Sequence, residues 1–167
     1  MIYPLEFLKY LHSKGFSLAT GVPCSYFKQL FSSFHRYKKI QYVPATREDE
    51  AMGIATGYFL GGGQSFLVMQ NSGLATVGDA LTSLAQLYKI PLLLLVSYRG
   101  LEEDIDFPEH SLMGTVTERV LKAYNLPYWI LTPDHWKTTI DEALKKMTSS
   151  NLPVCLLVKK GVFTRGC

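Results

Sequence analysis

The amino-acid sequence predicts a three-layer α/β/α fold built around a six-stranded parallel sheet. Short apolar runs alternate along the chain with segments of helical period, which is the pattern of consecutive βα units. Two of the runs, LLLLV and VCLLV, are apolar on both faces, as expected of strands that helices cover from both sides. With 167 residues, 47% of them hydrophobic, the chain can fill one core, so we expect a single domain over residues 1–167.

The expected strands are the apolar runs bounded by turn and loop residues, at 17–22, 40–44, 65–70, 91–97, 127–131 and 153–159. Around them, apolar residues recur every three or four positions, which is the period of a helix that buries one face. These stripes are Leu5, Leu8 and Leu11; Phe27, Leu30, Phe31 and Phe34; Ala51, Ile54, Ala55, Tyr58 and Phe59; Leu74, Val77, Leu81 and Leu84; and Trp136, Ile140, Ala143, Leu144 and Met147. A weaker helix is expected over 112–124, after an irregular segment at 98–110.

Composition excludes several classes of protein. The 17 basic and 14 acidic residues are interspersed, so no basic surface for nucleic acid is expected. No apolar run reaches the roughly 18 to 20 residues that cross a bilayer, and the N-terminus lacks the pattern of a signal peptide. The cysteines, Cys24, Cys155 and Cys167, form no CxxC pair, so neither a disulfide framework nor a zinc site is indicated. We therefore expect a cytoplasmic protein with no membrane or nucleic-acid partner.

Four loops that follow expected strands are the candidate ligand-binding segments. They are GVPCS at 21–25, ATREDE at 45–50, QNSGL at 70–74 and SYRG at 97–100. In open parallel sheets, ligands bind at the carboxyl ends of the strands, where all four loops should meet. No GxxxxGK[ST] or GxGxxG fingerprint is present, and the GGGQ run at 61–64 precedes a strand instead of following one. The sequence therefore gives no sign of a mononucleotide or dinucleotide site.

Glu48 is the most informative single residue. Thr46 and Asp49 have the spacing of a capping box, which would place Glu48 in the first turn of the third helix. Taken alone, a carboxylate there can simply complement the helix dipole. Glu50 lies two residues further on, about 200° around a helix, so it would point away from whatever Glu48 addresses.

The segment EDEAMGIATGY, which begins at Glu48, resembles the E-x-x-A-x-x-x-A-x-G-Y run of thiamine-diphosphate enzymes. GVPCS is similar to the early G-V-P loop of that family. QNSGL, PLLLLVSYRG and VKKGVF resemble segments of its phosphonopyruvate and sulfopyruvate decarboxylases. The similarity covers nearly the whole chain, as the pyrimidine-binding (PYR) domain of such an enzyme.

The resemblance assigns roles to the loop residues. It implies that Glu48 is the catalytic acid, which hydrogen-bonds ring nitrogen N1′ of the cofactor and must be largely buried to share a proton with it. It implies that Asn71, Ser72 and Gly73 also contact the cofactor. Residues expected to contact the substrate are Cys24, Ser25, Asn71, Arg99 and His110, with Arg99 offering a bidentate fork to an anionic group. For Ser25 and Ser72 the alternative is a helix cap, and for Arg99 and His110 a solvated or structural role.

The resemblance also implies a partner. Family members bind magnesium and the cofactor diphosphate through a Gly-Asp-Gly and a later Asn in a second (PP) domain, whereas this chain has only GDA at 78–80, inside an expected helix. Thiamine diphosphate would therefore be shared with a β subunit that carries the PP domain and Mg²⁺, in an α₂β₂ assembly or a larger multiple. Met1 and the length favour a natural short subunit over a domain excised from a longer enzyme.

The function implied is that of an α subunit of a 2-oxo-acid decarboxylase acting on phosphonopyruvate or sulfopyruvate. The alternative is a non-catalytic regulatory or binding subunit with the same fold, using the segment at 98–110 to contact a partner. A flavodoxin-like binder of a small ligand is a third possibility. The sequence does not distinguish a phosphonate from a sulfonate, because both present three oxygens in similar geometry and differ chiefly in charge.

Overall fold

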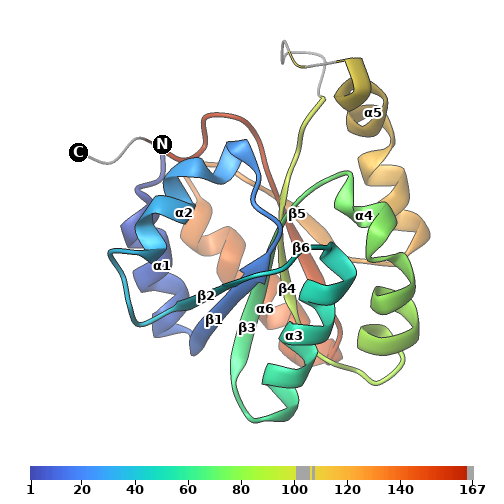
Figure 1. Cartoon of the computed structure of the whole chain (residues 1–167), viewed down its shortest axis with the longest axis horizontal. Coiled ribbons are helices and arrows are strands. Elements are labelled where there is room, and N and C mark those ends of the chain that lie inside the picture. The colour runs from blue at the N-terminus through green and yellow to red at the C-terminus, as the bar shows by residue number, and fades with distance from the viewer. Residues whose placement is uncertain (101–105, 107, 165–167) are drawn as a thin grey trace.

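A computed structural model describes residues 1–100, 106 and 108–164. It contains one six-stranded sheet in which every strand pair is parallel, with the strand order β2-β1-β3-β4-β6-β5 (Figure 1). The strands are β1 Phe16–Gly21, β2 Gln41–Pro44, β3 Gln64–Gln70, β4 Leu93–Ser97, β5 Tyr128–Leu131 and β6 Val154–Val158. The expected strands and their parallel arrangement are confirmed, with shifts of one or two residues at most ends.

Helices cover both faces of the sheet, and this confirms the predicted three layers (Figure 1). On one face lie α1 Pro4–Ser13, α2 Lys28–Phe34 and α6 Trp136–Ser150, with a short 3₁₀ turn, η1 Ser25–Phe27, leading into α2. On the other lie α3 Glu48–Leu60, α4 Gly73–Thr76, η2 Ala80–Gln86 and α5 Pro108–Ala123. Neighbouring strand residues face opposite layers: Phe66 and Val68 pack toward the first group, and Leu67 and Met69 toward the second.

The expected fourth helix is divided in the structure. Its first part is the single turn of α4, and its second part, η2, has π-helical hydrogen bonds such as Ile90 N–H to Ala85 O at 2.8 Å. The wider π turn adds a residue per turn and so moves the buried face along by one position. Leu81 and Ala85 are fully buried as a result, whereas Leu84 is only half-buried.

The weaker helix predicted at 112–124 begins four residues earlier, at Pro108, so that His110 lies in the first turn of α5. At the other end of the fold, Ile2 and Phe163 form an isolated parallel bridge, and Thr164 N–H donates to Ile2 O at 3.1 Å. The two ends of the described chain therefore lie side by side. No helix among the described residues is long and apolar enough to cross a membrane.

Candidate active site at the carboxyl edge of the sheet

The four candidate loops leave the sheet at one edge. Gly21 is in register with Pro44 and Val68, and Gln70 is in register with Ser97. The chain turns sharply at Gly21, where φ is +147° and an added Cβ would come within 1.9 Å of Val68 O. Only glycine fits so close to the neighbouring strand. This close approach brings the GVPCS loop against the end of β3.

Glu48 is the first residue of α3, directly after the loop that follows β2. The predicted Thr46–Asp49 capping box is wrong. The carboxylate of Glu50 instead accepts hydrogen bonds from the Thr46 N–H and hydroxyl, both at 2.7 Å, while Asp49 pairs with Arg47 at 2.9 Å. Because Glu50 lies one position further along the helix than the predicted partner, it can fold back over the first turn. Both neighbouring carboxylates are thus used in local contacts, and Glu50 is directed away from Glu48 toward Thr46.

The side chain of Glu48 lies across the loop that follows β3. An ideal Cβ built on Gly73 would meet Cγ of Glu48 at 2.6 Å, and its Cδ and Oε1 both at 2.8 Å. Gly73 itself is buried, and the Glu48 residue is half-buried in the single chain. The structure therefore brings these two predicted site residues together, with the carboxyl group at the carboxyl edge of the sheet.

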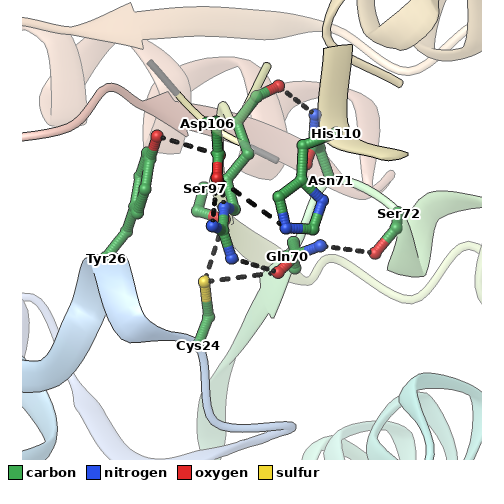
Figure 2. Close-up of polar contacts among 9 residues, drawn as sticks. Cys24, Tyr26, Gln70, Asn71, Ser72, Ser97, Asp106 and His110 are labelled. Carbon is green, nitrogen blue, oxygen red and sulfur yellow. Dashed lines mark hydrogen bonds and ion pairs between the residues drawn. The ribbon is translucent and has the colours of Figure 1, made fainter. Parts of the chain in front are cut away.

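A second group of polar side chains gathers at the ends of β1, β3 and β4, and Figure 2 shows how they converge. Arg99 Nη1 donates to Gln70 Oε1 at 3.1 Å. The Cys24 thiol lies 3.8 Å from the same amide oxygen and 3.2 Å from Ser97 Oγ. Gln70 Nε2 in turn donates to Ser72 Oγ at 3.0 Å. Cys24, Arg99 and Ser72, which the sequence placed in three separate loops, are thus joined through one glutamine.

Asp106 anchors this group. Arg99 donates to both of its carboxylate oxygens, from Nε at 2.8 Å and from Nη2 at 2.6 Å, which is a bidentate pair. The hydrogen bond to Asp106 raises the pKa of the Arg99 guanidinium above its ordinary value. Tyr26 donates its hydroxyl to Asp106 at 3.4 Å and places its ring 5.0 Å from the guanidinium carbon. His110 Nε2 lies 3.9 Å from Asp106 Oδ1.

Asn71 is turned inward. Its side chain is fully buried, and Nδ2 donates to Arg99 O and to Thr117 Oγ1, both at 2.9 Å. Its Oδ1 has no hydrogen-bond partner among the described residues. In this arrangement Asn71 ties the end of β3 to α5, and it is the side chain of Gln70 that lies among the ligand-edge residues. The expected contact of Asn71 with cofactor and substrate stays a prediction, and its buried oxygen is the atom that could make it.

The helix-cap alternatives for the two serines are not seen. Neither Ser25, at the start of η1, nor Ser72, before α4, makes a side-chain cap hydrogen bond. Ser25 is exposed, and it lines a groove of about 460 Å³ together with Cys24, Lys28 and Tyr42. This groove opens beside the GVPCS loop and extends the predicted pocket wall along α2.

Gln70, Tyr26, Ser97 and Asp106 were missed by sequence reasoning. Gln70 stands at the end of a strand next to Asn71, so the candidate loop itself was a signal for it. Asp106 lies in the irregular segment at 98–110, which has no periodicity to fix where a side chain points. Within the residues that the structure describes, no group of three or more histidine, cysteine or acidic side chains could hold a metal ion.

Comparison with known proteins is consistent with this geometry. Residues 6–117 match the family model of the thiamine pyrophosphate enzyme N-terminal TPP-binding domain, and this range includes every candidate site residue. The chain belongs to the thiamine pyrophosphate enzyme family. The resemblance drawn from EDEAMGIATGY and the other loops is confirmed.

The relatives of this TPP-binding domain include both two-subunit and longer proteins. The sulfopyruvate decarboxylase subunit alpha of Methanococcus maripaludis is 37% identical over 152 residues, which cover 90% of each chain. The subunit of the same name from Methanocaldococcus jannaschii is 36% identical over 88% of this chain and 87% of the relative. The phosphonopyruvate decarboxylase of Streptomyces hygroscopicus is 33% identical over 97% of this chain, which spans only 41% of that protein.

The site residues fit the pyrimidine half of thiamine diphosphate. A half-buried carboxyl group is held at the ligand edge by the backbone of α3 and by contact with Gly73, and within the part of the chain that the structure describes it forms no salt bridge. A carboxyl group in such a position can hydrogen-bond a ring nitrogen.

Proposed function

We propose that this chain is the α subunit of a thiamine-diphosphate-dependent decarboxylase of sulfopyruvate or phosphonopyruvate, with Glu48 as the acid that activates the cofactor. The observation that carries the proposal is the placement of the Glu48 carboxyl group against Gly73 at the carboxyl edge of the sheet. The family match over residues 6–117 and the names of the relatives support it.

Different residues of this chain have different roles in the proposed reaction. When bound, thiamine diphosphate supplies the carbon that attacks the 2-oxo group and accepts the electron pair left by carbon dioxide. Glu48 holds a proton at its carboxyl group and shares it with N1′ of the pyrimidine ring. Arg99, fixed by Asp106, and the amide of Gln70 orient the anionic substrate beside Cys24.

The same proposal requires a second chain. We infer that a β subunit carries the PP domain, holds the diphosphate and Mg²⁺, and closes over the carboxyl edge of this sheet, in an α₂β₂ assembly or a larger multiple. Two observations support this. Two of the α-subunit relatives match this chain over 87% and 90% of their length, and the phosphonopyruvate decarboxylases extend well beyond the matched part. Covering Glu48 would complete the burial of its side chain beside the pyrimidine ring.

The test is Glu48→Gln in the complex with the partner subunit. Turnover should fall by roughly 10²-fold to 10⁴-fold, the contribution typical of a positioned acid, while assembly and melting temperature stay unchanged. Cofactor affinity, measured by calorimetry, should weaken because a neutral amide is a poorer partner for the ring. Asp49→Asn is the matched control, since it removes the neighbouring charge on the same turn and should keep near-normal turnover.

Two outcomes would contradict the proposal. Near-normal turnover of the assembled Glu48→Gln enzyme would remove Glu48 from the mechanism. An assembled wild-type enzyme that turns over neither substrate would reject the substrate class, and would favour a regulatory subunit with the same fold.

A further inference from the structure

We propose that Asp106 is a specificity-determining residue that makes this site prefer a 2-oxo acid with a sulfonate group over one with a phosphonate group. The inference rests on the function proposed above and narrows its substrate class. It starts from the bidentate pairing of the site's arginine with a carboxylate from the segment after β4.

Asp106 is a fixed part of the site. Its side chain is only 6% exposed and that of Arg99 only 13%, so water screens the pair weakly. Its carboxylate accepts two hydrogen bonds from Arg99 and one from Tyr26. Breaking a desolvated pair of this kind leaves an uncompensated charge, so an incoming anion does not simply replace Asp106.

Arg99 nevertheless keeps the capacity to bind an anion. A guanidinium has five N–H donors, and the bonds to Asp106 and Gln70 use three of them. The remaining donors are on the Nη atoms, at the end of the side chain that faces Gln70. A substrate head group that binds there is a near neighbour of the Asp106 carboxylate.

The charge of this cluster distinguishes the two head groups. The positive charge of Arg99 is offset by the negative charge of Asp106, so the pair offers hydrogen-bond donors with little net charge. A sulfonate carries a single negative charge near neutral pH, whereas a phosphonate, like a phosphate monoester, carries about 1.5 to 2. The Asp106 carboxylate repels the additional charge of the phosphonate. At protein-surface dielectric this repulsion is worth about tenfold or more in affinity.

The experiment measures kcat/KM for sulfopyruvate and for phosphonopyruvate with the assembled α and β subunits. The wild-type enzyme should prefer sulfopyruvate, and Asp106→Asn should lower that preference by about tenfold. Asp106→Glu, which restores the charge, should restore the preference. Sulfoacetate and phosphonoacetate lack the 2-oxo group and can be tested as competitive inhibitors, so that binding is measured apart from chemistry. The ratio of their inhibition constants should change in the same way, falling in Asp106→Asn and recovering in Asp106→Glu.

Glu109→Gln is the matched control, because it removes an exposed carboxylate three residues away on the same segment and should change the ratio by less than about twofold. A purely structural role of Asp106 would lower kcat/KM for both substrates equally and leave the ratio unchanged, which would overturn the inference. A wild-type preference for phosphonopyruvate would overturn it too. Failure of the wild-type complex to use either substrate would reject the proposed function instead.

Discussion

Gly73 lacks a side chain at the place where the Glu48 carboxyl group rests. The loop after β3 and the first turn of α3 approach so closely that a methyl group on residue 73 and the Glu48 side chain would compete for the same space. The backbone of Gly73 is helical, so glycine is needed there for room and not for its conformational freedom. Gly73, which lies against the proposed catalytic acid, is therefore recognisable by its missing side chain.

Replacement of Gly73 by alanine should separate activity from stability. The added methyl group should push the flexible Glu48 side chain off the loop, so we expect turnover of the assembled enzyme to fall at least about tenfold. The free energy of unfolding should change by less than about 1 kcal/mol, because a half-exposed side chain can move aside and alanine favours the helix. Urea denaturation and steady-state kinetics on the same preparation measure both.

Ala75→Ser serves as the control for Gly73→Ala, because it adds one atom to an exposed position of the same short helix. It should leave turnover unchanged. If Gly73→Ala also retained full turnover, the contact between residue 73 and Glu48 would have no part in positioning the acid.

Single residues were predictable from sequence to differing degrees. Glu48 and Arg99 lie just beyond the carboxyl ends of β2 and β4, so their edge of the sheet could be inferred from the chain alone. The place of the Gln70 side chain beside Arg99 and Cys24 could not, because consecutive residues at a strand end point in opposite directions and the register decides which one lies on which side. Asp106 reaches Arg99 from an irregular segment, where no periodicity constrains direction.

At the scale of elements, α5 is held to the sheet by a cluster of two tyrosines and one glutamate. Tyr98, directly after β4, donates to Glu118 Oε1 at 3.0 Å, and Tyr128, at the start of β5, donates to Glu118 Oε2 at 2.6 Å. The hydrogen bonds from Tyr128 and Tyr98 lower the pKa of Glu118. The pKa of both tyrosines is raised to about 12. Burial is the larger cause for Tyr98, and the hydrogen bond to Glu118 is the larger cause for Tyr128.

Glu118→Gln should destabilise the chain by about 1 kcal/mol near neutral pH, a value reduced for the partial exposure of the cluster. The folded tyrosines bind their protons more tightly than the unfolded ones, whose pKa is about 10, so their contribution is complete below pH 10 and is lost as the pH rises toward 12. The lowered pKa of Glu118 sets the lower pH limit. The contribution of Glu118 to the free energy of unfolding is lost as the pH falls below the ordinary pKa of glutamate.

The measurement is urea denaturation of the wild-type and Glu118→Gln chains at several pH values. The difference between them should be constant from about pH 6 to 9 and shrink on either side. Glu109→Gln, an exposed glutamate of the same helix, should show no such pH dependence. A constant difference up to pH 12 would mean that the tyrosines do not interact with Glu118 as described.

The elements also show where sequence patterns fall short. The stripe of Leu74, Val77 and Leu81 correctly identified a helical segment that buries one face, and these residues are fully buried. The stripe did not reveal the break between α4 and η2. The four-residue spacing of Val77 and Leu81 fits the buried face of an α-helix and equally the start of the wider π-helical turn. The start of α5 was missed for a related reason, since its first turn is exposed and carries no apolar stripe.

At the scale of the whole molecule, the central strands are sealed between two helical layers. Cys155 of β6 is fully buried, and this burial raises the pKa of its thiol well above its usual range. A thiol reagent at pH 8 should therefore not modify Cys155 in the folded chain, because only the thiolate reacts and it must first reach solvent.

The experiment uses a chain with Cys24→Ser and Cys167→Ser, so that Cys155 is the remaining cysteine. Its labelling rate should match the opening of the sheet and rise at the same urea concentration as the loss of secondary structure. Labelling of the native chain as fast as a free thiol would show that the sheet is not sealed. The same chain in denaturant, where labelling should be complete, is the control.

The architecture of the whole molecule was largely predictable, because alternating apolar runs and helical stripes leave few arrangements other than three layers. The order of the strands was not, since nothing local states that β6 lies between β4 and β5. The proposed β subunit is likewise beyond local pattern, because its residues are not part of this sequence.

Because Ile2 pairs with Phe163, the two ends of the described chain lie next to each other. A short glycine-rich linker could join the two ends, and the chain could be reopened at the exposed turn between α3 and β3 without cutting a strand. Such a circularly permuted form would move the free ends far along the sequence while preserving every layer. It would offer a new point for tethering the proposed β subunit, so that both chains could be produced as one polypeptide.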